Sequence, residues 1–173
     1  DGESLARQFL YGQRYFLNTF GRLARIGWIP DSFGFSGNLP QIMAKSGIEV
    51  YLTHKVIWMD TNEFPYHSFI WRGIDGTEIP TQVLVTSYNE MMTLNSIYRY
   101  WRSYRQKDSV PFLVYCYGYG DGGGGPTREM LEYIDLVNAM PSLPQLRNLV
   151  EAEYIDAVKR YARSMPVWNG ELY

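Results

Sequence analysis

Short apolar runs alternate with amphipathic stretches along this chain of 173 residues. Residues 26–29, 50–53 and 112–117 have the length and composition of strands, and the stretches between them space their apolar side chains as helices do. The run 112–117 is apolar without interruption, which is typical of a strand buried on both faces of a sheet. The alternation predicts an α/β fold with a largely parallel sheet flanked by helices.

Turn and capping residues set the expected boundaries of these elements. Asn38 is expected to cap the second helix, and Gly21 to end the first one in a left-handed conformation. We expect helices at residues 3–20, 39–46, 93–107, 126–138 and 151–163, a hairpin of residues 68–72 and 78–85, and a last short strand at residues 167–168.

Composition excludes several classes of protein. Hydrophobic residues make up 46% of the chain and charged residues 20%, as in soluble globular domains. The net charge is −2 and no basic stripe is present, so a nucleic-acid partner is not expected. No apolar run approaches the ~18 residues of a membrane helix, so no membrane partner is expected. Cys116 is the only cysteine and is expected to be a buried thiol, which together with the lack of a visible signal peptide favours a cytoplasmic location.

The segment of residues 27–42 carries the strongest functional signal. Asp31 follows the first expected strand, and Trp28, Phe33 and Phe35 stand close to it in sequence. A carboxylate at a strand tip among aromatic rings suits the binding and cleavage of a sugar. The alternative is that Asp31 bonds backbone amides in a turn, which is the commoner role of such an aspartate, and that each aromatic ring packs in a core. The residues alone leave both interpretations open.

The pattern from Trp28 to Ser36, followed by Leu-Pro-Gln-Ile at 39–42, resembles the nucleophile motif of glycoside hydrolase family 38, the metal-dependent α-mannosidases. Further segments fall in the order of that family's bacterial and cytosolic or vacuolar branch, at residues 2–8, 64–76, 118–127 and 166–173. The resemblance implies that residues 1–173 are part of the family's N-terminal catalytic domain, a barrel-like α/β fold, with no internal domain boundary. It also implies hydrolysis of terminal α-D-mannosyl residues from oligosaccharides by a parent protein several times longer.

Retaining hydrolysis of a glycoside needs two carboxyl groups roughly 5 Å apart. By resemblance, Asp31 is the nucleophile and Asp121 is the candidate acid/base. Another branch of the family has two adjacent Asp residues here and uses the second one, where this chain has Gly122. The glycine run 120–125 lacks the Lys-Ser/Thr ending of a nucleotide-binding P-loop, which leaves a ligand-approaching loop or a flexible linker.

The position of the candidates along the chain supports a shared cleft without reference to any family. Asp31, the pair His54-Lys55 and Asp121 each follow an expected strand. In α/β folds, reactive groups gather where parallel strands end. We therefore expect these side chains to meet in one cleft.

The resemblance also implies a metal and sugar contacts. Asp31 would bind a divalent cation, Zn²⁺, and Lys55 would lie near the sugar. From their residue type, and not from the resemblance, Trp28 and Phe33 are candidates to stack on the apolar faces of the sugar. The family's other metal ligands, a His-x-Asp pair and a downstream His, have no counterpart in this chain, and Zn²⁺ normally has three or four protein ligands. We assign neither His54 nor His67 to metal. We expect the chain alone to bind metal weakly and to lack mannosidase activity.

The competing hypothesis is a non-catalytic carbohydrate-binding or scaffold module. Its support is the aromatic share of 16%, since aromatic rings build carbohydrate platforms as well as cores. The pair of carboxylates separates the two hypotheses, because a binding module does not need two acids aimed at one point.

Overall fold

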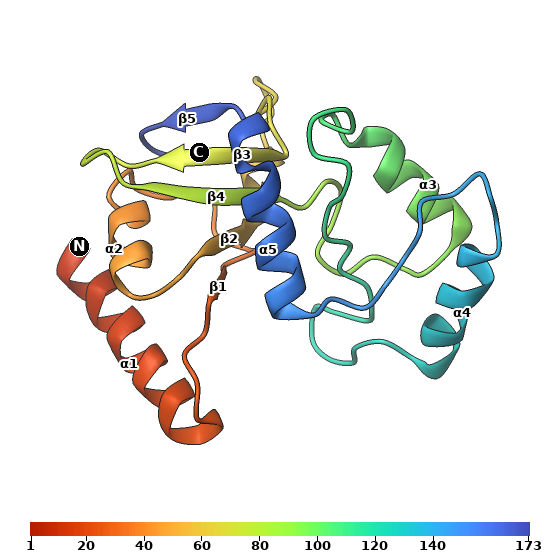
Figure 1. The fold of residues 1–173 in the computed structure, drawn as a ribbon, viewed down its shortest axis with the longest axis horizontal. Coiled ribbons are helices and arrows are strands. Elements are labelled where there is room, and N and C mark those ends of the chain that lie inside the picture. The colour runs from red at the N-terminus through yellow and green to blue at the C-terminus, as the bar shows by residue number, and fades with distance from the viewer.

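A mostly parallel five-stranded sheet lies in one half of the molecule (Figure 1). The structure is a computed structural model that describes residues 1–173. The strands, in the spatial order β1-β2-β4-β3-β5, are β1 (Ile26–Trp28), β2 (Val50–Thr53), β4 (Glu78–Val83), β3 (Ser68–Arg72) and β5 (Val167–Asn169). Only the hairpin pair β3–β4 is antiparallel. The predicted α/β class and the predicted hairpin are confirmed.

The strand register brings three strand ends to one edge. Trp28 at the end of β1 pairs with Leu52 of β2, and Thr53 at the end of β2 pairs with Val83 at the end of β4. Because these three neighbouring strands run parallel, the segments that follow them emerge side by side. These segments contain residues 29–37, 54–58 and 84–90.

Of the five α-helices, the first, second and fifth lie beside the sheet, and the third and fourth stand to one side of it (Figure 1). The five helices are α1 (Gly2–Phe20), α2 (Leu39–Lys45), α3 (Leu94–Ser103), α4 (Arg128–Asn138) and α5 (Glu151–Tyr161), with short 3-10 helices η1 (Lys55–Ile57) and η2 (Ala162–Ser164). As expected, Gly21 ends α1 in the left-handed region, with φ of 70°. None of the helices has both the length and the apolar character that crossing a bilayer requires.

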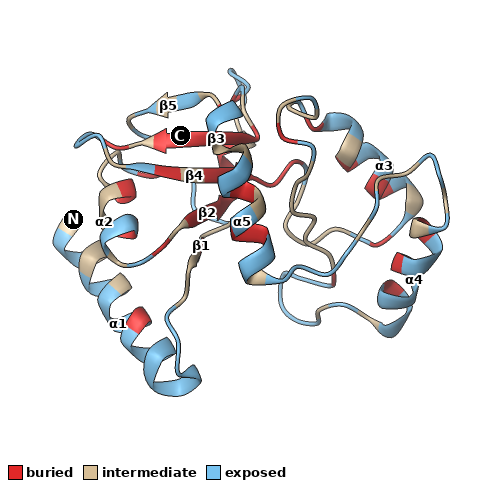
Figure 2. Ribbon diagram, in the orientation of Figure 1, coloured by how far each residue is buried: buried red, intermediate tan, exposed pale blue.

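The sheet is covered on both faces, as its apolar strands predict. Tyr51 of β2 and Trp71 of β3 pack with Met43 of α2, whereas Val50 of β2 packs with Ile155 of α5. Neighbouring residues of a strand point to opposite faces, so β2, buried at all of its positions, contributes to both cores (Figure 2). A third, smaller core lies between α3 and α4, away from the sheet.

The predicted strand 112–117 is wrong. This segment does not pair with the sheet and forms a single isolated β-bridge, between Tyr117 and Glu90. Side chains bind its carbonyls instead: the Tyr100 hydroxyl donates to Val114 O at 2.7 Å, and Gln82 Nε2 donates to Phe112 O at 3.4 Å. The apolar run predicted burial on both faces, whereas residues 112–117 are only partly buried. The run also carried no signal about which groups would bind its backbone.

Two smaller expectations also differ from the structure. Asn38 precedes α2, but its side chain makes no capping hydrogen bond and accepts one from Ser36 Oγ at 2.5 Å. Helix α3 ends at Ser103 rather than 107, because the backbone of Tyr104 is extended.

Candidate functional site

Asp31 stands in the loop that follows β1, at the edge where three parallel strands end. The loop is fixed to the end of β2, since Thr53 Oγ1 donates to Ile29 O at 2.8 Å and the Lys55 amide donates to Pro30 O at 3.2 Å. The Asp31 side chain is 64% exposed, and no backbone amide donates to its carboxylate. The carboxylate therefore does not tie down the turn in which it lies.

The far end of this loop is also anchored. The backbones of Phe35 and Leu172 exchange two hydrogen bonds, of 2.7 and 2.9 Å. A Cβ atom on Gly37 would lie 3.1 Å from the backbone of Gly170, so the loop passes too close to the chain before Leu172 for a larger residue to fit easily. With both ends held, the loop presents Asp31 from a defined position.

Lys55 makes the closest ionic contact of Asp31. Its Nζ lies 3.4 Å from Asp31 Oδ1, and its side chain is only 8% exposed. The ammonium is shielded by aromatic rings, with its Nζ 3.5 Å from the ring centre of Trp58 and 5.3 Å from those of Phe33 and Tyr88. A buried ammonium needs such partners, because burial without them carries a large desolvation penalty.

Tyr88 is a site residue that the sequence pattern did not indicate. It follows β4, and its hydroxyl donates to Asp31 Oδ1 at 3.1 Å. This hydrogen bond is the main reason why the pKa of Tyr88 is raised, and burial and the charges of Asp31 and Asp121 add to it. Tyr88 follows a strand of the expected hairpin. This position would have indicated it as a site residue if the pairing of that strand with β2 had been known.

His54 is a buried structural residue beside this cluster. Its Nδ1 lies 3.1 Å from the Leu84 carbonyl oxygen, which can only accept, so this nitrogen carries the proton. Burial lowers the pKa of His54 and favours the neutral ring. The ring packs edge-on against Tyr88 at 5.4 Å and so helps to fix the tyrosine.

Asp121 lies in an exposed loop, residues 118–125, and not after a strand as predicted. The loop is closed at its neck, where the Tyr119 amide donates to Gly125 O at 3.0 Å. A Cβ atom on Gly118 would lie 2.6 Å from the backbone of Gly125, so glycine is required there. Asp121 itself has a positive φ of 53°, an uncommon conformation that Asp and Asn tolerate better than most residues.

The loop nevertheless reaches the neighbourhood of Asp31. Gly120 lies so close to Asn89 that a Cβ atom on it would come within 2.8 Å of the Asn89 Cβ. The charge of Asp121 also contributes to the raised pKa of Tyr88, the residue that donates to Asp31. Tyr88 is thus hydrogen-bonded to Asp31 and lies within the electrostatic range of Asp121.

The two predicted aromatic platforms are placed differently. Phe33 is exposed, lies near the Lys55 ammonium and meets Trp58 edge-on at 5.9 Å. Trp28 is also exposed, at the end of β1, but no ring contact or hydrogen bond joins it to Asp31, Phe33 or Lys55. The structure therefore groups Phe33 with the site and leaves Trp28 beside it.

The chain alone does not supply a complete metal site. The Asp31 carboxylate is exposed, and its Oδ2 accepts no hydrogen bond. However, no group of three or more His, Cys, Asp or Glu side chains stands close enough together to hold a metal ion. Protein-bound Zn²⁺ normally has at least three such ligands, so the residues present do not by themselves fit the ion.

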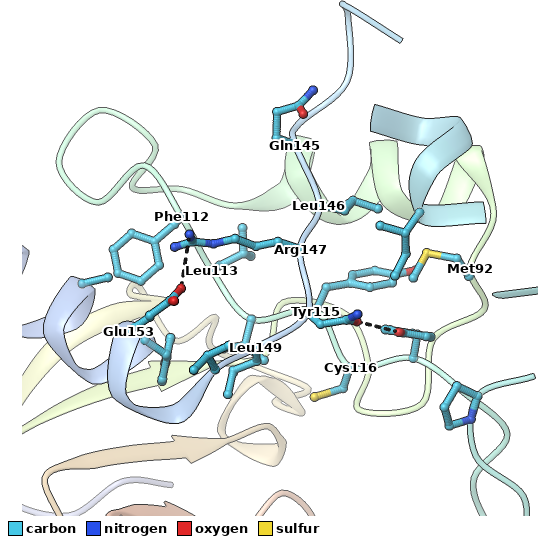
Figure 3. Close-up of a pocket in the computed structure, with 18 residues that line it drawn as sticks. Met92, Phe112, Leu113, Tyr115, Cys116, Gln145, Leu146, Arg147, Leu149 and Glu153 are labelled. Carbon is cyan, nitrogen blue, oxygen red and sulfur yellow. Dashed lines mark hydrogen bonds and ion pairs between the residues drawn. The ribbon is translucent and has the colours of Figure 1, made fainter. Parts of the chain in front are cut away.

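A pocket of about 500 Å³ lies elsewhere, between residues 112–117, residues 145–150 and α5 (Figure 3). Its lining is mostly apolar, and its one carboxylate, Glu153, pairs with Arg147 at 3.5 Å. Cys116 is half-buried in its wall, and burial raises the pKa of this thiol to about 11. The pocket shares no residue with the Asp31 cluster and has no pair of acids, so it is not the candidate active site.

Known proteins resemble this chain over its whole length. Residues 1–171 match the family described as glycosyl hydrolases family 38 N-terminal domain. The protein of Saccharomyces cerevisiae named alpha-mannosidase is 38% identical, and the alignment covers 99% of this chain and 17% of that protein. Alpha-mannosidase 2C1 of Homo sapiens is 35% identical, with the same coverage. The chain thus spans about one sixth of the length of these relatives.

A solved structure shares the fold. The crystal structure of an alpha-mannosidase from Enterococcus faecalis V583 superposes with a TM-score of 0.75 over 98% of this chain and 20% of that one. The sequence identity is 22%, so this likeness supports the arrangement of strands and helices and not the identity of site residues.

Proposed function

The chain belongs to glycosyl hydrolase family 38, and on this premise we propose that the protein containing it is a retaining α-mannosidase whose nucleophile is Asp31. The proposed substrates are oligosaccharides with terminal α-D-mannosyl residues, in line with the names of its relatives. We also propose that residues 1–173 form part of one catalytic domain, and that the protein is cytoplasmic, which its single cysteine suits.

One observation carries the proposal: the Asp31 carboxylate is exposed, with Oδ1 held and Oδ2 unbound, at the edge where three parallel strands end. A structural aspartate in a turn would instead accept backbone amides. Reactive groups in α/β folds lie at this edge of the sheet.

In the proposed reaction, Asp31 Oδ2 attacks the anomeric carbon of the mannosyl residue. The bond from that carbon to the leaving oxygen breaks as the carboxyl group of Asp121 gives its proton to the oxygen. The Asp121 carboxylate then removes a proton from water, whose oxygen displaces Asp31 from the anomeric carbon. Two inversions at one carbon give net retention of configuration.

Lys55 and Phe33 have supporting roles in this proposal. The Lys55 ammonium contacts Oδ1, so it neutralises the oxygen that does not attack. Phe33 and Trp28 present exposed rings on which the apolar face of a sugar can stack. The contact of Lys55 with the sugar stays a prediction. In the structure the Lys55 ammonium instead contacts Asp31.

We also propose that the protein binds a divalent cation such as Zn²⁺ and that Asp31 is the ligand supplied by this chain. When bound, such an ion would polarise sugar hydroxyl groups. This chain provides one of its expected ligands, and the others would come from the rest of the protein. The steps above are therefore derived for Asp31 and Asp121 without the ion.

The test is the Asp31→Ala variant of the full-length protein. We expect kcat for 4-nitrophenyl α-D-mannoside to fall by about a thousandfold or more, because the bond-forming atom is lost. Asp135→Ala, which removes an exposed carboxylate from α4, is the matched control and should retain wild-type turnover. Appreciable turnover by the Asp31 variant would contradict the assignment. Mannoside binding without any turnover by the wild-type protein would favour the carbohydrate-binding module.

A further inference from the structure

We propose that Trp58 is a positioning residue of this site, which holds the Lys55 ammonium against Oδ1 of Asp31 and so keeps Oδ2 directed to the open side. The proposal rests on the proposed function of Asp31 and adds a residue that does not touch the carboxylate itself.

The first step is the contact between Trp58 and Lys55. The ammonium lies 3.5 Å from the centre of the Trp58 ring, much nearer than the 5.3 Å to Phe33 or to Tyr88. Ammonium groups within about 6 Å of a ring centre are attracted to the ring, and tryptophan attracts them most strongly. Trp58 is therefore the nearest of the aromatic rings around this cation.

The second step is the burial of the lysine. The side chain of Lys55 is 8% exposed, whereas Trp58 is 63% exposed. The indole thus stands between the ammonium and solvent, and Phe33, packed edge-on against it at 5.9 Å, supports it. Removing the indole would open Lys55 to water, where an ion pair with an exposed carboxylate is weak.

The third step is the asymmetry of the carboxylate. Lys55 Nζ at 3.4 Å and the Tyr88 hydroxyl at 3.1 Å both contact Oδ1, and Oδ2 accepts no hydrogen bond from the protein. The terminal torsion of an aspartate is soft, so a carboxylate without fixed partners rotates freely. Two contacts on one oxygen restrict this rotation, and alignment of the attacking atom has a large effect on rate.

An alternative role for Trp58 is stacking of its exposed face on a sugar. The two roles have different kinetic signatures. Loss of a stacking surface weakens substrate binding and raises KM, whereas loss of an alignment that matters in the transition state lowers kcat and leaves KM unchanged.

The kinetic test uses the full-length protein and 4-nitrophenyl α-D-mannoside. We expect Trp58→Leu to lower kcat by about tenfold or more with KM changed by less than about twofold. Trp58→Phe keeps a ring over Lys55 and should restore most of the rate. Trp101→Leu is the matched control, because Trp101 also faces an ammonium, that of Lys107 at 5.6 Å, but lies on α3.

Combining variants tests whether Trp58 acts through Lys55. In a Lys55→Met background, Trp58→Leu should have little further effect on kcat, because the cation that it holds is gone. A rise in KM alone, unchanged kinetics in Trp58→Leu, or equal effects in both backgrounds would overturn the proposal. If wild type turns over substrate and Asp31→Ala does not, such a result leaves the proposed function intact.

A second measurement does not depend on turnover. The rate at which an amine-acylating reagent modifies Lys55, followed by peptide mass spectrometry, reports how well the lysine is shielded. Modification should be slow in wild type and in Trp58→Phe, and faster by about tenfold in Trp58→Leu, with exposed Lys45 as the internal reference. Fast modification of Lys55 in wild type, or no change in Trp58→Leu, would overturn the proposal even if the protein is not a mannosidase.

Discussion

The carboxylate of Asp31 is held by one oxygen and free at the other. Tyr88 and Lys55 both reach Oδ1, from the segments that follow β4 and β2, while Oδ2 and most of the side chain face solvent. Asp121 lies in a separate loop, and its charge contributes to the raised pKa of Tyr88. The site therefore contains Asp31, the candidate nucleophile, whose Oδ1 has two partners. It also contains Asp121, the candidate acid/base, which is exposed in its loop.

The acid/base assignment of Asp121 is tested by its dependence on the leaving group. Asparagine suits the left-handed conformation at this position, so Asp121→Asn should fold normally. We expect it to slow hydrolysis of α-mannobiose by about a hundredfold or more, and of 4-nitrophenyl α-D-mannoside much less, because nitrophenolate leaves without a proton. Equal losses with both substrates would contradict a role in protonation, and Asp135→Ala again serves as control.

The sequence indicated where Asp31 and Lys55 lie in the fold, but it did not indicate which side chains contact them. The place of Asp31 after a short strand could be read from local turn residues, and Lys55 from its place after another strand. Tyr88 and Trp58 could not be found this way. Tyr88 reaches the site because β4 pairs with β2, and Trp58 belongs to it because the Lys55 ammonium lies over its ring. Neither contact can be read from the neighbouring sequence.

Helix α1 and the segment 112–117 show the difference between a local signal and a dependence on distant partners. Helix α1 begins where Asp1 accepts the Ser4 amide at 2.9 Å, and it ends at Gly21. The segment 112–117 has the composition of a central strand, yet side chains from α3 and β4 take its carbonyls. Hydrophobic pattern indicates burial, but strand pairing depends on which partner is available.

The junction between α3 and β3 should make the domain sensitive to acid. Gln106 Oε1 accepts the amides of His67 and Ser68 at 2.7 and 2.9 Å, and the Arg105 amide donates to His67 Nδ1 at 3.3 Å. Burial, and then the charges of Arg105 and Lys107, lower the pKa of His67 to about 4, while Glu63 acts in the opposite direction.

His67 is therefore expected to weaken the fold as the pH falls. The unfolded state takes up a proton near pH 6.5 and the folded state only near pH 4, so the free energy of unfolding should decrease between these values, by about 3 kcal/mol at most. Urea unfolding at several pH values should show this decrease, and His67→Asn should reduce it while keeping an acceptor for the Arg105 amide. An unchanged pH dependence in the variant would contradict the role of His67.

At the scale of the whole molecule, the chain is one part of a larger family architecture. It matches the family over residues 1–171 but spans about one sixth of the length of its relatives. Within it, one sheet edge gathers Asp31, Lys55 and Tyr88, whereas the 500 Å³ apolar pocket lies apart from them. The sequence resemblance predicted the family and the fold class, and the strand register explains why residues 57 positions apart, Asp31 and Tyr88, meet.

The role of Asp31 as the nucleophile is tested most directly by identifying the residue that becomes bonded to the sugar. The full-length protein would be treated with a fluorinated mannosyl fluoride that forms the glycosyl-enzyme faster than water removes it, then digested and sequenced by mass spectrometry. We predict one mannosyl adduct, on the carboxylate of Asp31. An adduct on a different residue, or turnover with inversion of configuration and no adduct, would contradict this prediction.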